Sequence, residues 1–352
     1  MTVYNGLPHL SAAIDSILAQ TFTSFELVII DDAGTDGSVA CIERYHDPRI
    51  RLVRNERNLG QTRSLNRGLE FVRAAYVARM DQDDVCLPER FARQVEVLDQ
   101  RAAVAAVGTW MYGMDRDGRR LGMIGERIDA YGAFLGLLLI GGCPLCHPSV
   151  MFRRDAIQRL GGYDESMAHT EDYDLWSRLA VSGARAFVIP EPLVMYRMHG
   201  GQQSVTRAAA HHRNWYRAHE RLVAAFCDPE RARAVSLLLR MEATLRFEVP
   251  SKRQLASTFK ALRRMLVTIS QRLQLSAEEA RDLTRAIGRR LGPVFWIGPS
   301  FDRCPEFLFQ PMLFLFMPWS VPSVRRLLSA CAVRLRRLRG MLRLASDGLS
   351  RR

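Results

Sequence analysis

The feature that most constrains this chain is a pair of acidic clusters, each placed directly after a short apolar segment of high β propensity. The first segment, residues 25–30, ends at Asp31 and Asp32, and the second, residues 76–80, ends at the sequence Asp-Gln-Asp-Asp. In open parallel sheets, ligands bind beyond the carboxyl ends of the strands. Because unpaired carboxylates are costly to bury, we predict that both clusters lie at such an edge and serve a binding site.

Strand and helix patterns alternate through the first half of the chain. Further strand patterns lie at 50–54 and 104–108, and helical patterns at 10–20, 38–45, 61–72 and 88–100. Pro88 suits the first turn of the last of these helices, where a missing N–H leaves nothing unsatisfied. The alternation predicts an α/β fold with a mixed, mostly parallel sheet flanked by helices.

The first six residues have the pattern of a strand end followed by a turn. Either the first strand is very short, or the sequence starts downstream of the natural beginning, and we expect the second.

The pattern changes to helix from about residue 205. Residues 208–226, 232–247 and 255–273 are long and amphipathic, and Ser276 with Glu279 forms a capping-box pattern before another helix. An aromatic, proline-broken stretch and an arginine-rich tail follow. We therefore predict three parts: an α/β domain at 1–204, a mainly helical C-terminal region at 205–292, and the apolar and basic segment at 293–352.

The net charge of +13, with a pI near 10.0, favours anionic partners. Residues 321–352 hold nine arginines and one acidic residue, so the tail supplies +8 of this charge. The apolar pieces before the tail are too short to span a bilayer. An apolar segment followed by a basic helix is typical of a segment lying in the interface of an anionic membrane. A core helix followed by a solvated tail is an equally good interpretation.

Seven cysteines at irregular spacing indicate no disulfide framework, and no secretion signal opens the chain. These features favour a cytoplasmic protein, peripheral at the inner membrane if the tail binds lipid. Cys143 and Cys146 lack the second pair that a four-ligand zinc site needs, so we expect loop cysteines without function. No nucleic-acid-binding motif is visible, and no nucleic acid is expected as a partner.

Asp81 and Asp83 stand two positions apart after a strand. Two such carboxylates can share a divalent cation and a polar ligand, and Mn²⁺ or Mg²⁺ completes its coordination with phosphate oxygens and water. For Asp36 and Asp84 a cap or turn role is expected.

A third acidic cluster, residues 170–176, opens a helix. Its carboxylates either complement the helix dipole or supply a general base, and the pattern leaves both open.

Seven motifs occur in order within residues 1–204. They are Thr2–Gly6, Val28–Ser38, Arg54–Gly60, Met80–Arg90, His147–Phe152, Gly161–Glu165 and Thr170–Trp176. Together they resemble the motifs of family 2 (GT-A fold) inverting glycosyltransferases, which implies that residues 1–204 are a catalytic domain.

The resemblance implies roles on the donor side. Thr2, Tyr4 and Asp32 match positions that hold the nucleotide base, with Asp32 accepting from the uracil N–H and Tyr4 stacking. Arg63 would also help to hold the nucleotide, and Asp81 matches the residue near the ribose and diphosphate.

The resemblance also implies the catalytic and acceptor residues. Asp83 matches the metal ligand, and His199 either lies at the metal or phosphate or is a surface loop residue. Asp172 matches the catalytic base, and Glu171 would position the acceptor. His147 either lines the acceptor side or caps the turn before Pro148.

The implied activity is metal-dependent transfer of a sugar from a nucleotide-diphosphate sugar, with UDP favoured, to a saccharide or lipid-linked acceptor with inversion. Cell-surface polysaccharide or glycolipid synthesis is the expected setting. Nucleotidyl transfer to a sugar phosphate is disfavoured, because residues 6–11 lack the basic residue that holds a triphosphate. A basic membrane- or nucleic-acid-binding scaffold with a non-catalytic domain of this fold would leave the carboxylate clusters unexplained.

Overall fold

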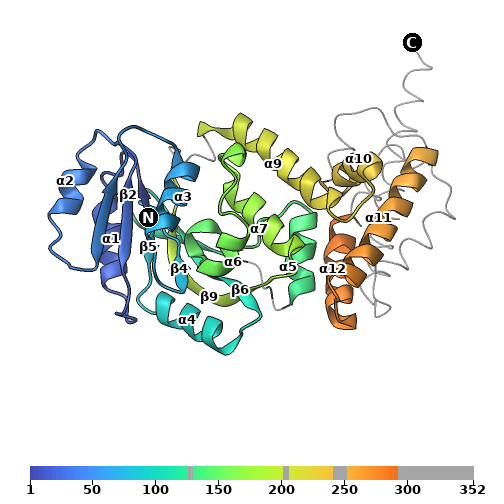
Figure 1. Ribbon diagram of the computed structural model, residues 1–352, viewed down its shortest axis with the longest axis horizontal. Helices are drawn as coiled ribbons and strands as arrows, with labels where there is room; N and C mark the ends of the chain where they lie inside the picture. Colours follow the sequence, from blue (N-terminus) through green and yellow to red (C-terminus); the bar gives the residue numbers. More distant parts are fainter. Residues whose placement is uncertain (126–127, 129, 201–205, 241–251, 292–352) are drawn as a thin grey trace, which may run out of the picture. The chain divides into compact units, whose positions relative to one another are not determined.

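A computed structural model gives the fold and describes residues 1–125, 128, 130–200, 206–240 and 252–291 (Figure 1). All of these residues belong to one compact unit, residues 1–301. The segment 293–352, predicted to associate with membranes, lies outside the described residues. None of the helices within the described ranges is both long enough and apolar enough to cross a membrane.

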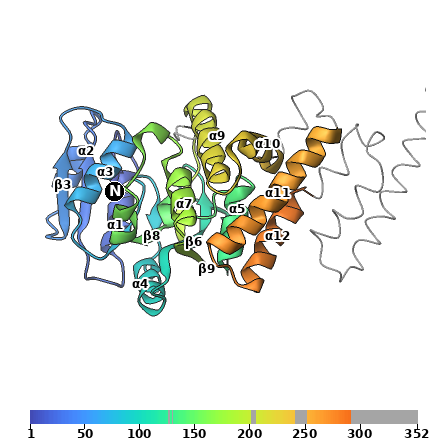
Figure 2. The same ribbon diagram turned by 45° about the vertical axis from the view of Figure 1, so that its right-hand side comes forward.

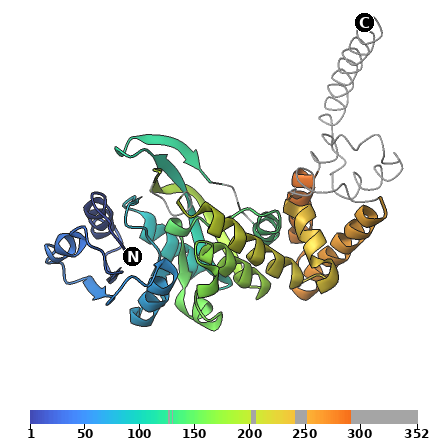
Figure 3. The same ribbon diagram turned by 90° about the horizontal axis from the view of Figure 1, so that it is seen from above.

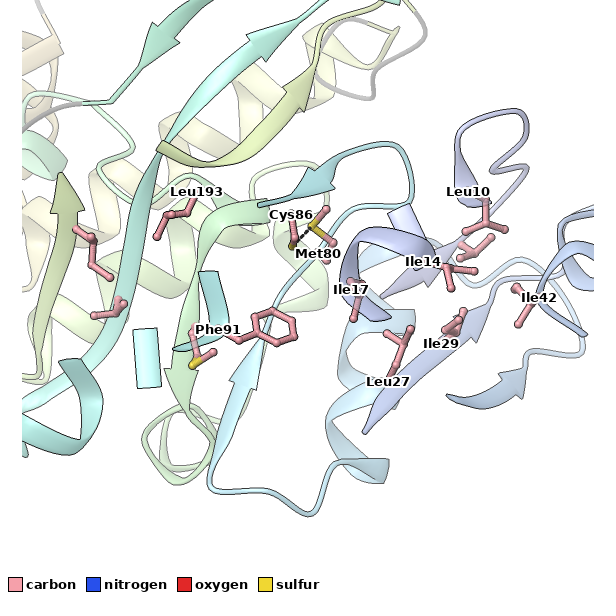
Figure 4. Close-up of a cluster of buried hydrophobic side chains, with 14 of the residues drawn as sticks. Leu10, Ile14, Ile17, Leu27, Ile29, Ile42, Met80, Cys86, Phe91 and Leu193 are labelled. Carbon is pink, nitrogen blue, oxygen red and sulfur yellow. Dashed lines mark hydrogen bonds between the residues drawn. The ribbon is translucent and has the colours of Figure 1, made fainter. Parts of the chain in front are cut away.

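The chain begins with a three-stranded parallel sheet of order β1-β2-β3. Its elements are β1 (Thr2–Val3), α1 (Leu10–Leu18), β2 (Leu27–Asp31), α2 (Ser38–Glu43), β3 (Ile50–Arg54) and α3 (Gln61–Phe71). Successive side chains of β2 point to opposite faces. Leu27 and Ile29 join a cluster of buried side chains with Ile14 of α1 and Ile42 of α2 (Figure 4). On the other face, β2 packs against α3, where a Cβ at Gly68 would lie 3.5 Å from Ile30 Cγ1.

The second sheet is mixed and has the order β4-β8-β6-β9-β5, with β7 on β6. Its strands are β4 (Tyr76–Ala78), β5 (Val85–Cys86), β6 (Val104–Met114), β7 (Arg120–Ile124), β8 (Met151–Arg153) and β9 (Arg185–Arg197). The helices are α4 (Arg90–Gln100), α5 (Tyr131–Leu139), α6 (Arg154–Arg159) and α7 (Glu171–Val181), with short 3₁₀ turns η1 (His147–Ser149) and η2 (Glu165–Met167). The hairpin of β6 and β7 stands away from the helices (Figure 3).

The predicted strands and helices of the first half are present, and the α/β fold with a mixed sheet is confirmed. Parallel pairing is limited to β1–β2–β3 and to β6–β9, whereas the other pairs of the second sheet are antiparallel. The prediction that Pro88 opens a helix was wrong. The helix begins at Arg90, because Leu87 N–H still bonds Leu193 of β9 (2.9 Å) and Pro88 C=O accepts from Thr21 N–H (2.9 Å).

The second half is helical, as predicted, with α9 (Ala208–Ala224), α10 (Pro229–Arg240), α11 (Lys252–Arg272) and α12 (Ala277–Leu291). The capping box is confirmed: Ser276 N–H donates to Glu279 Oε2 (2.9 Å), and Glu279 N–H donates to Ser276 Oγ (3.2 Å). Helix α12 packs against α5 (Figure 2), so the helical region is attached directly to the α/β region. The boundary at residue 204 stays a prediction.

Candidate functional site

Asp32, at the end of β2, is almost fully buried and holds the loop that follows β3. Its Oδ1 accepts from Asn55 Nδ2 (2.7 Å) and Leu59 N–H (2.8 Å), and its Oδ2 accepts from Gly60 N–H (2.9 Å). A carboxylate offers about four acceptor positions, so one further donor can still be accommodated. The structure therefore gives Asp32 a loop-organising role, and its contact with a nucleotide base stays a prediction.

Tyr4 follows β1 at the surface, with 48% of its area exposed. The side chain of Gln82 bonds both backbone groups of Tyr4, accepting from its N–H (2.8 Å) and donating to its C=O (3.2 Å). These two bonds tie the loop after β1 to the acidic loop after β4. Thr2 lies in β1 itself, half-buried. The backbone of Tyr4 is thus tied to the Asp-Gln-Asp-Asp loop, and about half of the residue is accessible to solvent.

Arg63, on α3, forms an ion pair with Glu165 of η2 (2.9 Å), and both side chains are about half exposed. This pair links α3 to the segment before α7. A role of Arg63 in nucleotide binding stays a prediction.

Arg79 is a buried cation at the centre of the site, with 4% of its side chain exposed. It forms an ion pair with Asp81, and its Nε has no hydrogen-bond partner among the residues that the structure describes. Its backbone N–H bonds Val150 of the loop before β8 (2.8 Å) and its C=O accepts from the buried Arg90 (2.7 Å), which fixes it in place. Burial raises the pKa of Glu171 and of Asp172, and the positive charge of Arg79 opposes this effect in both.

Asp83 and His199 lie side by side, with His199 Nε2 2.9 Å from Asp83 Oδ2, and each is about a quarter exposed. The buried Asp84 joins the segment that carries Asp83 to the segment that carries His199. Its Oδ1 accepts from Arg197 N–H (2.8 Å), while Arg197 Nε donates to Asp83 C=O (2.8 Å). The end of β9 is thereby fastened to the acidic loop, and His199 follows two residues later.

The expected cap or turn role holds for Asp36 but was wrong for Asp84. Asp36 accepts from Leu7 N–H (2.8 Å) and Ser38 N–H (3.0 Å) in a turn. Asp84 is instead 1% exposed, because the chain turns inward toward β9. Burial, followed by the charges of Asp81 and Asp83, raises the pKa of Asp84 well above the usual range.

A carboxylate beside an imidazole can hold Mn²⁺ or Mg²⁺ when other oxygen ligands complete the coordination. No group of three or more His, Cys, Asp or Glu side chains that could hold a metal occurs within the described ranges. A cation held by Asp83 and His199 would need further oxygen ligands, such as those of a diphosphate.

Glu171 and Asp172 form the first turn of α7. Glu171 is 5% exposed, and burial, followed by the charge of Asp172, raises its pKa to about 7. Burial also raises the pKa of Asp172, opposed by the bond from Tyr173 N–H to its Oδ1 (2.7 Å). Asp172 has no ion pair among the residues that the structure describes, whereas Asp174 in the same turn pairs with Arg178 (2.7 Å). Asp174 therefore has a structural pair within the helix, and a catalytic role of Glu171 or Asp172 stays a prediction.

His147 is buried, with 8% exposed, and its Nε2 lies 2.9 Å from the hydroxyl of Tyr163. It is the first residue of η1, whose cap is Cys146, so the alternative of a capping histidine was wrong. Burial, followed by the charge of Arg79, lowers its pKa well below the usual range, and the ring is neutral. Contact of His147 with an acceptor stays a prediction. Cys143 Sγ lies 3.8 Å from Asp172 Oδ2, beside the expected base.

Comparison with known proteins identifies the family of the chain. Residues 1–161 match the model of glycosyl transferase family 2. EpsE of Bacillus subtilis is 34% identical over 203 residues, which are 56% of this chain and 71% of EpsE. The chain belongs to glycosyl transferase family 2. The protein is a glycosyltransferase, and it is also similar to the amylovoran biosynthesis glycosyltransferase AmsE of Erwinia amylovora, at 30% identity over 54% of this chain and 70% of AmsE.

The fold of this glycosyltransferase is also that of a solved structure, residues 1–349 of Staphylococcus aureus TarS in complex with UDP-GlcNAc. The likeness covers 86% of this chain and 90% of that one, with a TM-score of 0.56 and 16% identity. The GT-A fold inferred from the motifs is therefore confirmed.

Sequence reasoning missed three groups in the site of the glycosyltransferase: Arg79, Cys143 and Gln82. For Arg79 a signal was present, because an arginine interrupts the apolar strand pattern just before Asp81. The positions of Cys143 and Gln82 depend on contacts with residues far along the chain, Asp172 and Tyr4. No local pattern marks them.

Proposed function

We propose that this glycosyltransferase transfers a sugar from a nucleoside diphosphate sugar, with UDP as the expected nucleotide, to an acceptor hydroxyl with inversion at the anomeric carbon. The observation that carries the proposal is Asp172: a carboxylate in the first turn of a rigid helix, without an ion pair in the described part of the chain, whose pKa is raised by burial. A base with a raised pKa takes a proton from a hydroxyl more readily.

In the proposed reaction Asp172 accepts the proton of the acceptor hydroxyl as the hydroxyl oxygen attacks the anomeric carbon. The bond to the leaving diphosphate breaks on the opposite face, so a single displacement inverts the configuration and no enzyme nucleophile is needed. Glu171, whose pKa is about 7, exists in both protonation states near neutral pH. It can donate or accept a hydrogen bond, which suits a residue that positions a second hydroxyl of the acceptor.

On the donor side, Asp32 and Tyr4 would hold the base, and Asp81 would face the ribose and diphosphate while paired with Arg79. Asp83 and His199 would hold Mn²⁺ or Mg²⁺. When bound, the cation supplies Lewis-acid stabilisation of the leaving diphosphate. The protein contributes the fixed loop: Arg197 and Asp84 keep Asp83 and His199 together before any ligand binds.

The proposed acceptor is a saccharide or lipid-linked saccharide of a cell-surface polysaccharide or glycolipid. AmsE, which is 30% identical in the matched region, is named for amylovoran biosynthesis. The charge of +8 within residues 321–352 favours an anionic surface, so we place the reaction at the cytoplasmic face of the membrane.

The donor is tested by titrating the protein with UDP, GDP and dTDP in a calorimeter, with and without Mn²⁺. We expect one nucleotide to bind tightly and only with the metal, and Asp83→Ala to weaken this metal-dependent binding. Binding of none of the three by a folded sample would contradict the proposal.

The base is tested with Asp172→Asn, which keeps the shape of the side chain but cannot accept the proton. We expect kcat to fall by about 10² to 10⁴, with nucleotide binding unchanged. Asp155→Asn is the control, because Asp155 forms an exposed pair with Arg159 within α6 (2.7 Å). Near-normal turnover by Asp172→Asn would rule out this residue as the base.

A further inference from the structure

Helix α9 belongs to the helical region, yet its first turns are fastened to the segment that carries the acidic pair of α7 (Figure 2). Thr170, the cap residue of α7, donates through its Oγ1 to His211 C=O (3.1 Å). One turn further along α9, Asn214 Nδ2 donates to Ala168 C=O (2.9 Å). The start of α9 therefore has a fixed position beside the start of α7.

The same part of α9 also packs on the loop that follows α5. A Cβ added at Gly141 would lie 2.5 Å from the ring of Trp215, so this ring lies directly against the backbone of the glycine. The loop continues to Cys143, whose Sγ is 3.8 Å from Asp172 Oδ2. The loop after α5 and the start of α9 thus both lie beside the start of α7.

His211 is the residue of α9 whose side chain lies near Asp172. Burial lowers the pKa of His211, and the charge of Asp172 opposes this effect. Burial raises the pKa of Asp172, and the charge of His211 is among the influences that oppose it. Charge interactions of this kind weaken with distance, so the imidazole and the carboxylate are neighbours. Both residues are partly exposed, and no hydrogen bond joins their side chains, so both are open to a ligand.

The rings beside His211 provide a flat aromatic surface. His212 is exposed, and its ring lies nearly parallel to that of Tyr216, with 6.4 Å between the centroids and an angle of 15° between the planes. The ring of His211 is 5.7 Å from that of His212, at 68° to it. Small-molecule sites combine aromatic rings with a few placed polar groups. A sugar ring matches such a surface, because it has an apolar C–H face and hydroxyl groups at its rim.

We propose that the start of α9 determines acceptor specificity, and that the acceptor is a saccharide with a hydroxyl hydrogen-bonded to His211 and a sugar ring packed on His212. This inference rests on the function proposed above, with Asp172 as the base. Burial keeps the imidazole of His211 neutral at pH 7, so it can both donate and accept a hydrogen bond. The predicted donor residues lie within residues 1–204, so acceptor choice would belong to a separate part of the chain.

The side chain of His211 can be replaced without loss of the contact that positions α9, because Thr170 bonds its backbone carbonyl. The test compares His211→Leu, which cannot form hydrogen bonds, with His211→Asn, which can donate and accept. Arg213→Leu is the control, because Arg213 is exposed and stands two positions further along α9, where it does not share a face with His211. Unchanged Tm and unchanged nucleotide affinity in the calorimeter show that a variant is folded and keeps its donor site.

Transfer is measured with UDP-glucose, UDP-galactose and UDP-N-acetylglucosamine as donors. The acceptors are p-nitrophenyl and dodecyl glycosides of glucose, galactose, mannose and N-acetylglucosamine. We expect His211→Leu to raise the acceptor KM about tenfold with the donor KM unchanged, and His211→Asn to recover most of this loss. A lower KM for the dodecyl forms would identify a lipid-linked saccharide as the acceptor, and equal values a soluble one; the loss in His211→Leu is expected with both.

An unchanged acceptor KM in His211→Leu, an equal rise of the donor KM, or no recovery in His211→Asn would overturn the inference. NMR of the imidazole protons separates this inference from the proposed transfer. Glycosides that shift the His211 and His212 signals without being glycosylated would uphold the inference and count against the transfer. A protein that binds a nucleotide but shows neither transfer nor such shifts with any glycoside would overturn the inference and leave the donor proposal standing. Failure to bind any nucleotide, with the imidazole shifts present, would count against the donor alone.

Discussion

At the scale of single residues, the site separates neighbouring carboxylates by their surroundings. Glu171 and Asp172 are adjacent in the first turn of α7. Within the described part of the chain, Glu171 Oε2 is buried without a hydrogen-bond partner, whereas Asp172 accepts from Tyr173 N–H. A buried carboxyl without partners is more stable in its neutral form. Burial raises the pKa of both carboxyls, to about 7 for Glu171, so Glu171 is partly protonated near neutral pH.

The raised pKa of Glu171 predicts a pH-dependent effect of Glu171→Gln on the free energy of unfolding. The folded protein raises the pKa of Glu171 from 4.5 to about 7, so the stability that this residue contributes is complete below pH 4.5 and is lost as pH rises through 7. Glutamine cannot ionise. We expect the variant to match the wild type near pH 4.5 and to exceed it above pH 7 by at most about 3 kcal/mol.

Unfolding in urea at several pH values measures this difference. Glu278→Gln is the control, because Glu278 is exposed on α12. A constant difference between Glu171→Gln and the wild type across this range would contradict the assigned pKa.

The sequence offers candidate site residues where the motifs are local, and it gives no sign of contacts between distant segments. Asp83 was singled out by spacing and by the resemblance, and Asp172 by the resemblance; the structure places His199 beside Asp83, and the roles of all three stay predictions. The environment of Asp84 could not be foreseen, since its bond to Arg197 joins positions 113 residues apart. Burial and partners across the fold, which decide protonation, are not encoded in any short segment.

At the scale of elements, most strand and helix positions were predictable because apolar periodicity and caps are local. The packing of α12 against α5 was not predictable. It depends on two glycines of α5, and their role is evident only when the neighbouring helix is in place. A Cβ at Gly132 would overlap the carbonyl oxygen of Glu279, and one at Gly136 would lie 2.5 Å from Ala286 Cβ. These glycines let the two helices approach closely and connect the helical region to the sheet region.

Gly132→Ala should therefore destabilise the protein, although alanine favours a helix over glycine by up to about 1 kcal/mol. The overlap involves backbone, which cannot move aside easily, and we expect a net loss of about 1–3 kcal/mol. Gly68→Ala is the matched control on α3, where a Cβ would meet Ile30 at an ordinary 3.5 Å. Denaturant unfolding should show opposite signs for the two variants, and a gain of stability in Gly132→Ala would refute the close packing.

At the scale of the whole molecule, charge is distributed unevenly along the chain. Of the net +13, residues 321–352 supply +8, while the proposed site contains the carboxylates of Asp81, Asp83, Glu171 and Asp172. A basic segment of this kind binds anionic lipid mainly by electrostatics, and each arginine near the surface contributes about 1 kcal/mol. An enzyme held at the membrane in this way meets a lipid-linked acceptor at a high local concentration.

We therefore predict that the full chain sediments with vesicles of phosphatidylcholine and phosphatidylglycerol, and that deletion of residues 293–352 abolishes this. Salt should weaken the association because the charges are screened. Replacing the nine tail arginines by glutamine separates the two contributions: loss of binding assigns it to charge, and retained binding assigns it to the apolar stretch. Arg263→Gln with Arg264→Gln on α11 is the control for surface arginines in general. If the truncated chain sediments as well as the full chain, the membrane contact lies in residues 1–292, and the tail has no part in placing the enzyme.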